Sequence, residues 1–131
     1  MSYSVYKIDL PESPEAVIFV NGILARNRAG FWWMWRNGVW IRNVTAQASG
    51  CVQVKAGICG LNELVLVSYW VDVASLKNFF KSEHHRQMMQ VIAEKPKSLC
   101  LYNETYKPSQ SGKYINEPQG MATIYAPEPA R

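Results

Sequence analysis

The run from Leu64 to Val71 is apolar almost without interruption, and it restricts the fold more than any other segment. Side chains on a strand alternate between two faces, and here both sets are apolar: Leu64, Leu66 and Trp70 against Val65, Val67 and Tyr69. A strand with one face in water would alternate strictly between apolar and polar residues. The sheet that contains this strand must therefore be covered on both faces.

The segments before this strand predict a strand, a helix and the first arm of a hairpin. Ala16 to Val20 is β-branched and apolar on consecutive positions, as in a buried core strand. Apolar residues near helical spacing predict a helix from about Ala29 to Ala48. Cys51 to Ala56 alternates between apolar and polar residues, and turn residues from Gly57 to Asn62 would connect it to the strand described above.

The segments after it predict a second helical layer and a last strand. Asp72 can cap a helix whose Leu76, Phe79 and Phe80 share a face, and Ser82 can cap a second segment, with a kink between the two. Ser98 to Tyr106 is the last predicted strand. The resulting order, βαββαβ, predicts the α+β ferredoxin-like fold, an antiparallel sheet with its helices on one face.

We expect 131 residues to form a single domain, with a core over about residues 16–106 and a tail rich in proline, glycine and serine over 107–131. The helices cover one face of the sheet. The simplest cover for the other apolar face is the same face of a second copy, so we expect a homodimer.

Composition excludes several classes of protein. The net charge is +4, but no block of lysines and arginines suggests nucleic-acid binding. The three cysteines are an odd number without metal-binding spacing, which argues against a disulfide framework and a zinc site. We find no signal peptide and no segment that would span a membrane, and expect a cytoplasmic protein.

Several segments resemble the dimeric α/β-barrel superfamily, and within it a monooxygenase-like family of unknown function from bacteria and fungi. The resemblance covers about residues 16–122. It rests on these segments: Val17 to Gly22, Asn27-Arg28, Leu66 to Trp70, Leu76 to Phe80, His85-Arg86, Asn103 to Tyr106, Gly112, Tyr114, Pro118 and Gly120-Met121. The family usually has histidine at Asn103, a tryptophan near Met89 and a longer tail, so this chain departs from its pattern. The resemblance implies a small-molecule pocket between sheet and helices.

His85 is our first candidate for chemistry. His84 and His85 are the only histidines, and an imidazole is the side chain that titrates near neutral pH. A helix restarting at Ser82 would turn His85 toward the sheet, whereas an unbroken helix from Asp72 would turn His84 there. His85 could act as a general base, or it could be a helix-packing residue with a satisfied hydrogen bond.

Charged and aromatic residues complete the predicted site. Arg86 or Arg28 could stabilise an oxyanion, and Glu104 could be a catalytic carboxylate or half of a structural ion pair. The remaining predicted substrate-binding residues are Trp33, Tyr69, Trp70, Met89, Asn103 and Tyr106. Aromatic residues at strand ends are more often packing residues, and the tryptophans of the first helix could roof the pocket, join the dimer interface or meet a membrane interface.

These residues favour a small-molecule enzyme that resembles cofactor-independent monooxygenases, with His85 as base and an aromatic or otherwise apolar substrate. We predict no cofactor and no metal. A haem enzyme, a dehydratase or an oxygenase, with His85 or His84 as axial ligand is the first alternative. A non-oxidative cyclase or isomerase, and a non-catalytic domain that binds an apolar ligand or a membrane interface, are the others.

Overall fold

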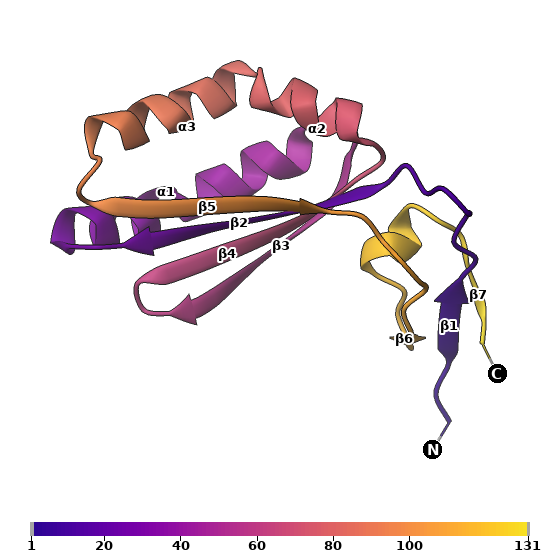
Figure 1. Cartoon of the computed structure of the whole chain (residues 1–131). Helices are drawn as coiled ribbons and strands as arrows, with labels where there is room; N and C mark the ends of the chain where they lie inside the picture. Colours follow the sequence, from indigo (N-terminus) through magenta and orange to yellow (C-terminus); the bar gives the residue numbers. More distant parts are fainter. Residues whose placement is uncertain (1, 131) are drawn as a thin grey trace.

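The computed structural model describes residues 2–130. Its central element is a four-stranded antiparallel sheet in the order β3-β4-β2-β5. The main elements are β2 (Val17–Ala25), α1 (Arg28–Gln47), β3 (Cys51–Gly60), β4 (Glu63–Trp70), α2 (Val73–Phe80), α3 (Glu83–Glu94) and β5 (Leu99–Tyr106). All three helices lie on one face of this sheet (Figure 1). The predicted ferredoxin-like α+β fold is therefore confirmed.

Short polar residues begin the helices, as the sequence predicted for α2 and α3. The Asp72 carboxylate accepts a hydrogen bond from the Ser75 amide at 2.8 Å, and the Ser82 hydroxyl accepts one from the His85 amide at 3.2 Å. Each bond satisfies an amide that has no partner within its own helix. The chain therefore restarts as α3 after Ser82, and this restart sets the direction of the His85 side chain.

Two strands are longer than their sequence predicted. β2 continues through Asn21 and Gly22 to Ala25, and β3 continues through Gly57 to Gly60, so the hairpin turn contains only Leu61 and Asn62. Glycine has a low strand propensity in isolation, but the ladder of hydrogen bonds to β4 outweighs that preference. The longer β2 places Asn21 in the middle of the sheet.

The core lies between the sheet and the helices. Trp70, Met34, Leu66, Leu76 and Val17 are almost fully buried there. The buried Trp70 indole donates a hydrogen bond to the Ser68 hydroxyl at 2.8 Å, and that hydroxyl donates to the Phe19 carbonyl at 3.3 Å. The polar atoms of this part of the core are thus satisfied, as burial in an apolar medium requires.

The two ends of the chain form a second, smaller sheet that the sequence did not predict. β1 (Val5–Ile8) pairs with β6 (Tyr114–Ile115) on one side and β7 (Pro127–Pro129) on the other, beside the short 3₁₀ helix η1 (Gly120–Thr123). The segment expected to be an irregular tail is therefore partly ordered by pairing with residues more than a hundred positions away. Such short strands carry little local signal, because distant partners supply most of their stability.

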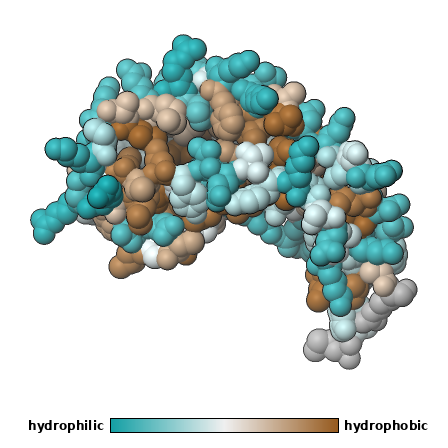
Figure 2. Space-filling model, in the orientation of Figure 1, coloured by the Kyte–Doolittle hydropathy of each residue, from teal (hydrophilic) through white to brown (hydrophobic). Residues whose placement is uncertain are grey.

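This smaller sheet gives the molecule an arched outline. It lies below one end of the central sheet, and the space-filling view shows a concave underside between the two parts (Figures 1 and 2). Ile18 and Tyr69, on the face of the central sheet away from the helices, pack against Met121 and Ala122 of η1. One end of the second face is thus covered by the chain itself, and the rest is open.

Candidate functional site between the sheet and the helices

A pocket lies between the central sheet and the helices, with about 570 Å³ of empty space that includes its open mouth. Its lining comes from β2, β5, α1, α2 and α3 and consists of Phe19, Asn21, Gly22, Ile23, Ile41, Thr45, Phe79, His85, Met88, Met89, Ile92, Leu101, Tyr102 and Asn103. Most of these side chains are apolar, so the few polar ones determine what the pocket can recognise.

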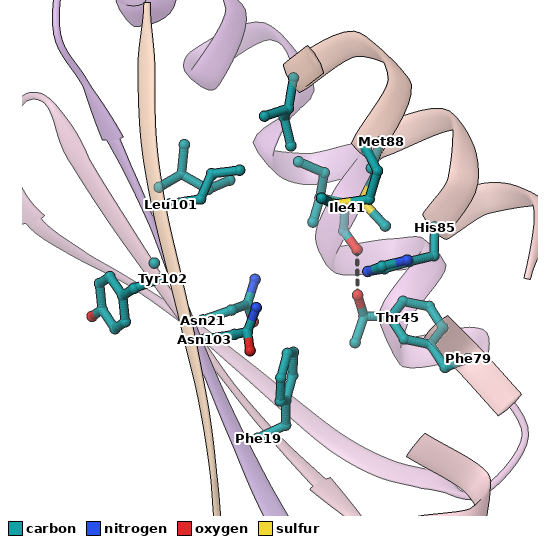
Figure 3. Close-up of a pocket in the computed structure, with 14 residues that line it drawn as sticks. Phe19, Asn21, Ile41, Thr45, Phe79, His85, Met88, Leu101, Tyr102 and Asn103 are labelled. Carbon is teal, nitrogen blue, oxygen red and sulfur yellow. Dashed lines mark hydrogen bonds between the residues drawn. The ribbon is translucent and has the colours of Figure 1, made fainter. Parts of the chain in front are cut away.

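Two asparagines form the polar part of the sheet wall. Asn21 of β2 and Asn103 of β5 are register partners, so their side chains emerge side by side on the same face. Both point toward the helices in the close-up view (Figure 3). Within residues 2–130, neither side chain has a hydrogen-bond partner. Two primary amides are therefore available to a ligand.

His85 enters the pocket from the helical side. Its ring packs on two rings of α2, with centroid distances of 5.6 Å to Phe79 and 5.2 Å to Phe80. Partial burial lowers the pKa of His85 below its ordinary value, and a hydrogen bond to the Phe80 carbonyl opposes part of that decrease. The neutral imidazole is therefore favoured at neutral pH. Because one ring nitrogen donates to that carbonyl, the other nitrogen can accept a proton.

The arrangement places a neutral imidazole on one wall and two amides on the opposite wall (Figure 3). The imidazole can accept a proton from a ligand, and amide N–H groups can stabilise a negative oxygen formed by that transfer. Asn103 is exposed to solvent, whereas the rings of Phe79 and Phe80 shield part of the His85 imidazole from water. The pocket thus has the parts for proton abstraction from an acidic, otherwise apolar molecule.

Three of the residues predicted from the sequence meet at this pocket. They are His85, Met89 and Asn103. The choice of His85 over His84 follows from the restart of the helix at Ser82. His84 is exposed, lies edge-on to Trp40 with ring centroids 6.4 Å apart, and lines a different cleft that includes Val44.

The two predicted arginines are not at the pocket. The Arg86 side chain is 71% exposed and forms an ion pair with Glu83 at 3.3 Å, one turn away on the surface of α3. Arg28 is exposed at the start of α1 and lines a shallow depression with Asn27 and Asn62. Neither guanidinium lines the His85 pocket, so the geometry assigns them no role at an anion formed there.

Three further predicted residues belong to the other face of the sheet. Residues of β5 alternate, and Glu104 and Tyr106 point away from the helices while Asn103 points toward them. Tyr69 shares that opposite face and packs against η1. A hydrogen bond between the Tyr106 hydroxyl and the Glu104 carboxylate raises the pKa of Tyr106. Among the described residues Glu104 forms no ion pair, and this contact with Tyr106 takes the place of the one considered from the sequence.

The two predicted tryptophans do not line the pocket. Trp70 has no exposed surface and packs on Phe79 with ring centroids 5.4 Å apart, so it is a core residue. Trp33 packs partly against the core and lines a groove between α1 and α3 that also contains Trp40. The part of α1 that closes the pocket is instead formed by Ile41 and Thr45, about two and three turns nearer the end of the helix.

Sequence reasoning missed Asn21 and Thr45. Asn21 carried a detectable signal, because it is a polar residue two positions after Phe19 and two before Ile23, and all three share a face. The strand was expected to end at Val20, so that alternation was not followed further. Thr45 carried no such signal, since its hydroxyl only donates to the Ile41 carbonyl at 2.8 Å within the helix.

No group of three or more histidine, cysteine or acidic side chains that could hold a metal ion occurs within residues 2–130. All three cysteines are free thiols. Cys51 is partly buried, whereas Cys59 and Cys100 are exposed. A haem enzyme stays a predicted alternative. In it His85 would be the axial ligand, because His85 is the histidine that reaches the pocket. None of the described helices is long and apolar enough to cross a bilayer.

The arrangement of strands and helices defines a ferredoxin-like α+β protein, and solved structures share this fold. SnoaB, a cofactor-independent oxygenase from Streptomyces nogalater, is 14% identical, with a TM-score of 0.56 over 73% of this chain and 95% of its own. The chain belongs to the monooxygenase af470-like family, whose model matches residues 17–124. The resemblance drawn from the sequence is thereby confirmed.

Other solved structures share the fold. A putative antibiotic biosynthesis monooxygenase from Deinococcus radiodurans is 14% identical, with a TM-score of 0.58 over 71% of this chain and 93% of its own. A conserved protein from Methanosarcina mazei is 15% identical, with a TM-score of 0.60 over 73% of this chain and 95% of its own. No curated protein matches the chain. At these identities the likeness concerns the fold alone.

Proposed function

We propose that this protein is an oxygenase of the cofactor-independent kind that acts on an aromatic or otherwise apolar small molecule in the pocket between sheet and helices. The observation that carries the proposal is the half-buried, neutral His85 opposite the unpartnered amides of Asn21 and Asn103. Membership of a monooxygenase-like family and the shared fold of SnoaB support it.

In this proposal His85 is the general base. A lowered pKa keeps the imidazole neutral and able to accept a proton in mildly acidic solution. The Phe80 carbonyl and the rings of Phe79 and Phe80 hold it in place. A substrate with an acidic O–H or activated C–H would lose its proton to His85 and become an electron-rich anion that can transfer electrons to dioxygen.

Asn21 and Asn103 take the role that the sequence suggested for arginine. Their amide groups can donate hydrogen bonds to the oxygen on which negative charge develops. An amide donor stabilises an anion less than a guanidinium does, but it remains neutral and so costs less to place in an apolar pocket. We expect these two residues to orient the oxygen-bearing edge of the substrate toward the sheet.

The apolar lining indicates the kind of molecule that fits. Phe19, Phe79, Met88 and Leu101 surround the space and offer no hydrogen bonds from their side chains. A substrate there gains from burying an apolar body, with its polar atoms at one edge. Hydroquinones and naphthols have this distribution, and they make suitable first substrates for assay.

Oxygen uptake with such a panel tests the proposal. The substitution His85→Gln should lower kcat about a hundredfold or more, because it removes the base while approximately keeping the side chain's size. Arg86→Gln is the control and should keep the activity, since Arg86 lies outside the pocket. Full activity in His85→Gln, or loss only in Arg86→Gln, would contradict the assignment.

The same preparation separates the alternatives. A saturable Soret shift on titration with haem, lost in His85→Ala, would replace the proposal with a haem enzyme. Turnover without oxygen uptake, still dependent on His85, would identify a cyclase or isomerase. Ligand binding without turnover, with an affinity unchanged in His85→Ala, would indicate a binding domain.

The proposed enzyme is a homodimer. Val20 and Leu24 of β2 and Val65 and Val67 of β4 lie on the sheet face away from the helices, and this chain leaves them half-buried. Such a face is rarely left in water, and its own copy related by a two-fold axis is the simplest cover. The arch formed with the smaller sheet leaves that face accessible (Figure 2).

A further inference from the structure

The outward face of α1 has an unusual composition for a helix that packs on a sheet. The buried residues Gly30, Met34, Ile41 and Thr45 share one side. At 100° per residue, the side directly opposite is occupied by Trp32 and Val39 together with Arg36 and Asn43. Charged and polar residues normally occupy that position on a surface helix. Here two large apolar side chains, Trp32 and Val39, lie among them.

These apolar side chains are exposed rather than covered by another part of the chain. Trp32 is 61% exposed and Val39 is 67% exposed, with the partly exposed Trp35 and Trp40 on either side. The Trp35 indole donates a hydrogen bond to the Leu61 carbonyl at 2.9 Å, which ties the tip of the β3–β4 hairpin to the helix. Leu61 is 79% exposed and therefore extends the same surface.

The charge of this surface is entirely positive. Arg28, Arg36 and Arg42 are exposed on α1, and the helix contains no acidic residue. Within residues 2–130, the only ion pair joins Arg86 to Glu83 on α3, so the three guanidinium groups have no carboxylate partner. The outward face of α1 therefore combines tryptophans, aliphatic side chains and unpaired arginines.

We propose that this outward face of α1 binds the surface of an anionic lipid bilayer. Tryptophan rings favour the boundary between headgroups and acyl chains, and arginines beside them would contact lipid phosphates. With three arginines along its length the helix would lie in the plane of the interface rather than cross it. This inference is independent of the proposed oxygenase activity.

A second copy of the chain is a poorer occupant for the same surface. A two-fold interface puts identical patches against each other, so the arginines of one helix would face those of its partner without any acidic residue on α1 between them. Like charges brought together at an interface oppose association. An anionic bilayer instead satisfies both the apolar and the charged residues.

Vesicle sedimentation of the full chain tests the proposal, with no substrate present. We expect binding to vesicles of phosphatidylcholine with phosphatidylglycerol, little binding to phosphatidylcholine alone, and weaker binding at high salt. Trp32→Ser combined with Val39→Ser should abolish it. Arg28→Gln combined with Arg36→Gln should weaken it about five-fold for each arginine removed.

Matched controls come from other exposed positions. Ile115→Ser removes an exposed aliphatic side chain from the smaller sheet, and Lys81→Gln removes an exposed charge after α2. Both should bind vesicles as the parent does. The proposal is overturned by absence of binding to anionic vesicles, or by binding that all variants share. It is also overturned if the Trp32 and Val39 substitutions reduce self-association in sedimentation velocity, which would make this face a protein interface.

Discussion

At the scale of single residues, the burial of His85 has a consequence for stability. Its pKa in the folded protein lies below the ordinary value of 6.5, so the unfolded chain binds the proton more readily. Above pH 6.5 the His85 imidazole is neutral in both the folded and the unfolded chain, so it does not lower the free energy of unfolding. As the pH decreases through 6.5 toward the lower, folded-state pKa, the unfolded chain is protonated first and the free energy of unfolding falls. Urea denaturation from neutral to mildly acidic pH should show this decrease.

The variant His85→Gln separates this contribution from that of other groups. Its unfolding free energy should depend less steeply on pH over the same interval, because glutamine does not titrate. A titration of the His85 ring protons by NMR, assigned with His84→Gln, measures the pKa directly. An identical pH slope in parent and variant would show that His85 is not desolvated in the folded protein.

The cysteines provide a second test at this scale. Burial raises the pKa of the Cys51 thiol to about 11, whereas Cys59 and Cys100 are exposed. Since the thiolate is the reactive form, Cys51 should be alkylated much more slowly at neutral pH. Mass spectrometry after brief iodoacetamide treatment should find two modified cysteines in the native protein and three after unfolding. Rapid modification of Cys51 in the native protein would contradict its burial.

At the scale of elements, the position of α1 depends on a close approach at Gly30. A Cβ atom there would lie 2.0 Å from the Ser98 carbonyl oxygen, and backbone cannot move aside as a side chain can. Gly30→Ala should therefore lower the free energy of unfolding by about 2–3 kcal/mol, as overpacking does elsewhere. Chemical denaturation measures the difference.

Gly38 is the matched control in the same helix. A Cβ atom there would meet only the end of the flexible Leu64 side chain, at 2.9 Å. Alanine also gains about 1 kcal/mol of helix propensity over glycine, which offsets a small rearrangement. Gly38→Ala should thus change stability by less than about 1 kcal/mol. Equal effects of the two substitutions would show that the approach of α1 to Ser98 is not tight.

At the scale of the whole molecule, the open face of the sheet determines assembly. Val67 lies near its centre on β4, and a carboxylate there would be desolvated in a dimer but hydrated in a monomer. Val67→Glu should therefore convert a dimer into a monomer, as measured by light scattering coupled to size-exclusion chromatography. Lys107→Gln, at an exposed position after β5, lowers the net charge by the same one unit and is the control for the change in charge.

The oligomeric state of the Val67→Glu variant also tests whether the His85 pocket is complete within one chain. The His85 pocket is on the helical side of the sheet, so its lining residues come from one chain. A monomeric Val67→Glu variant that remains folded should retain measurable turnover if the proposed function is correct. A parent protein that is already monomeric would contradict the proposed dimer without affecting the assignment of His85.

Local patterns allowed much of the fold to be predicted. A continuous apolar run defined β4, and Asp72 and Ser82 marked the beginnings of α2 and α3 because short polar side chains satisfy free amides at helix starts. The predicted restart at Ser82 left His85 and His84 as alternatives, the family resemblance favoured His85, and His85 is the one that lines the pocket. These features depend on residues only a few positions apart, which is why the sequence reveals them.

Tertiary structure alone decided which distant residues meet. Asn21 and Asn103 became neighbours through the pairing of β2 with β5, and β1 found its place through β6 and β7. Strand register is a non-local property, and a shift of one residue would turn Asn103 away from the pocket and Glu104 into it. The sequence by itself determined the elements of the central sheet, the helices that cover it and the sheet's two apolar faces. The pairing of strands determined the chemistry of the pocket between them.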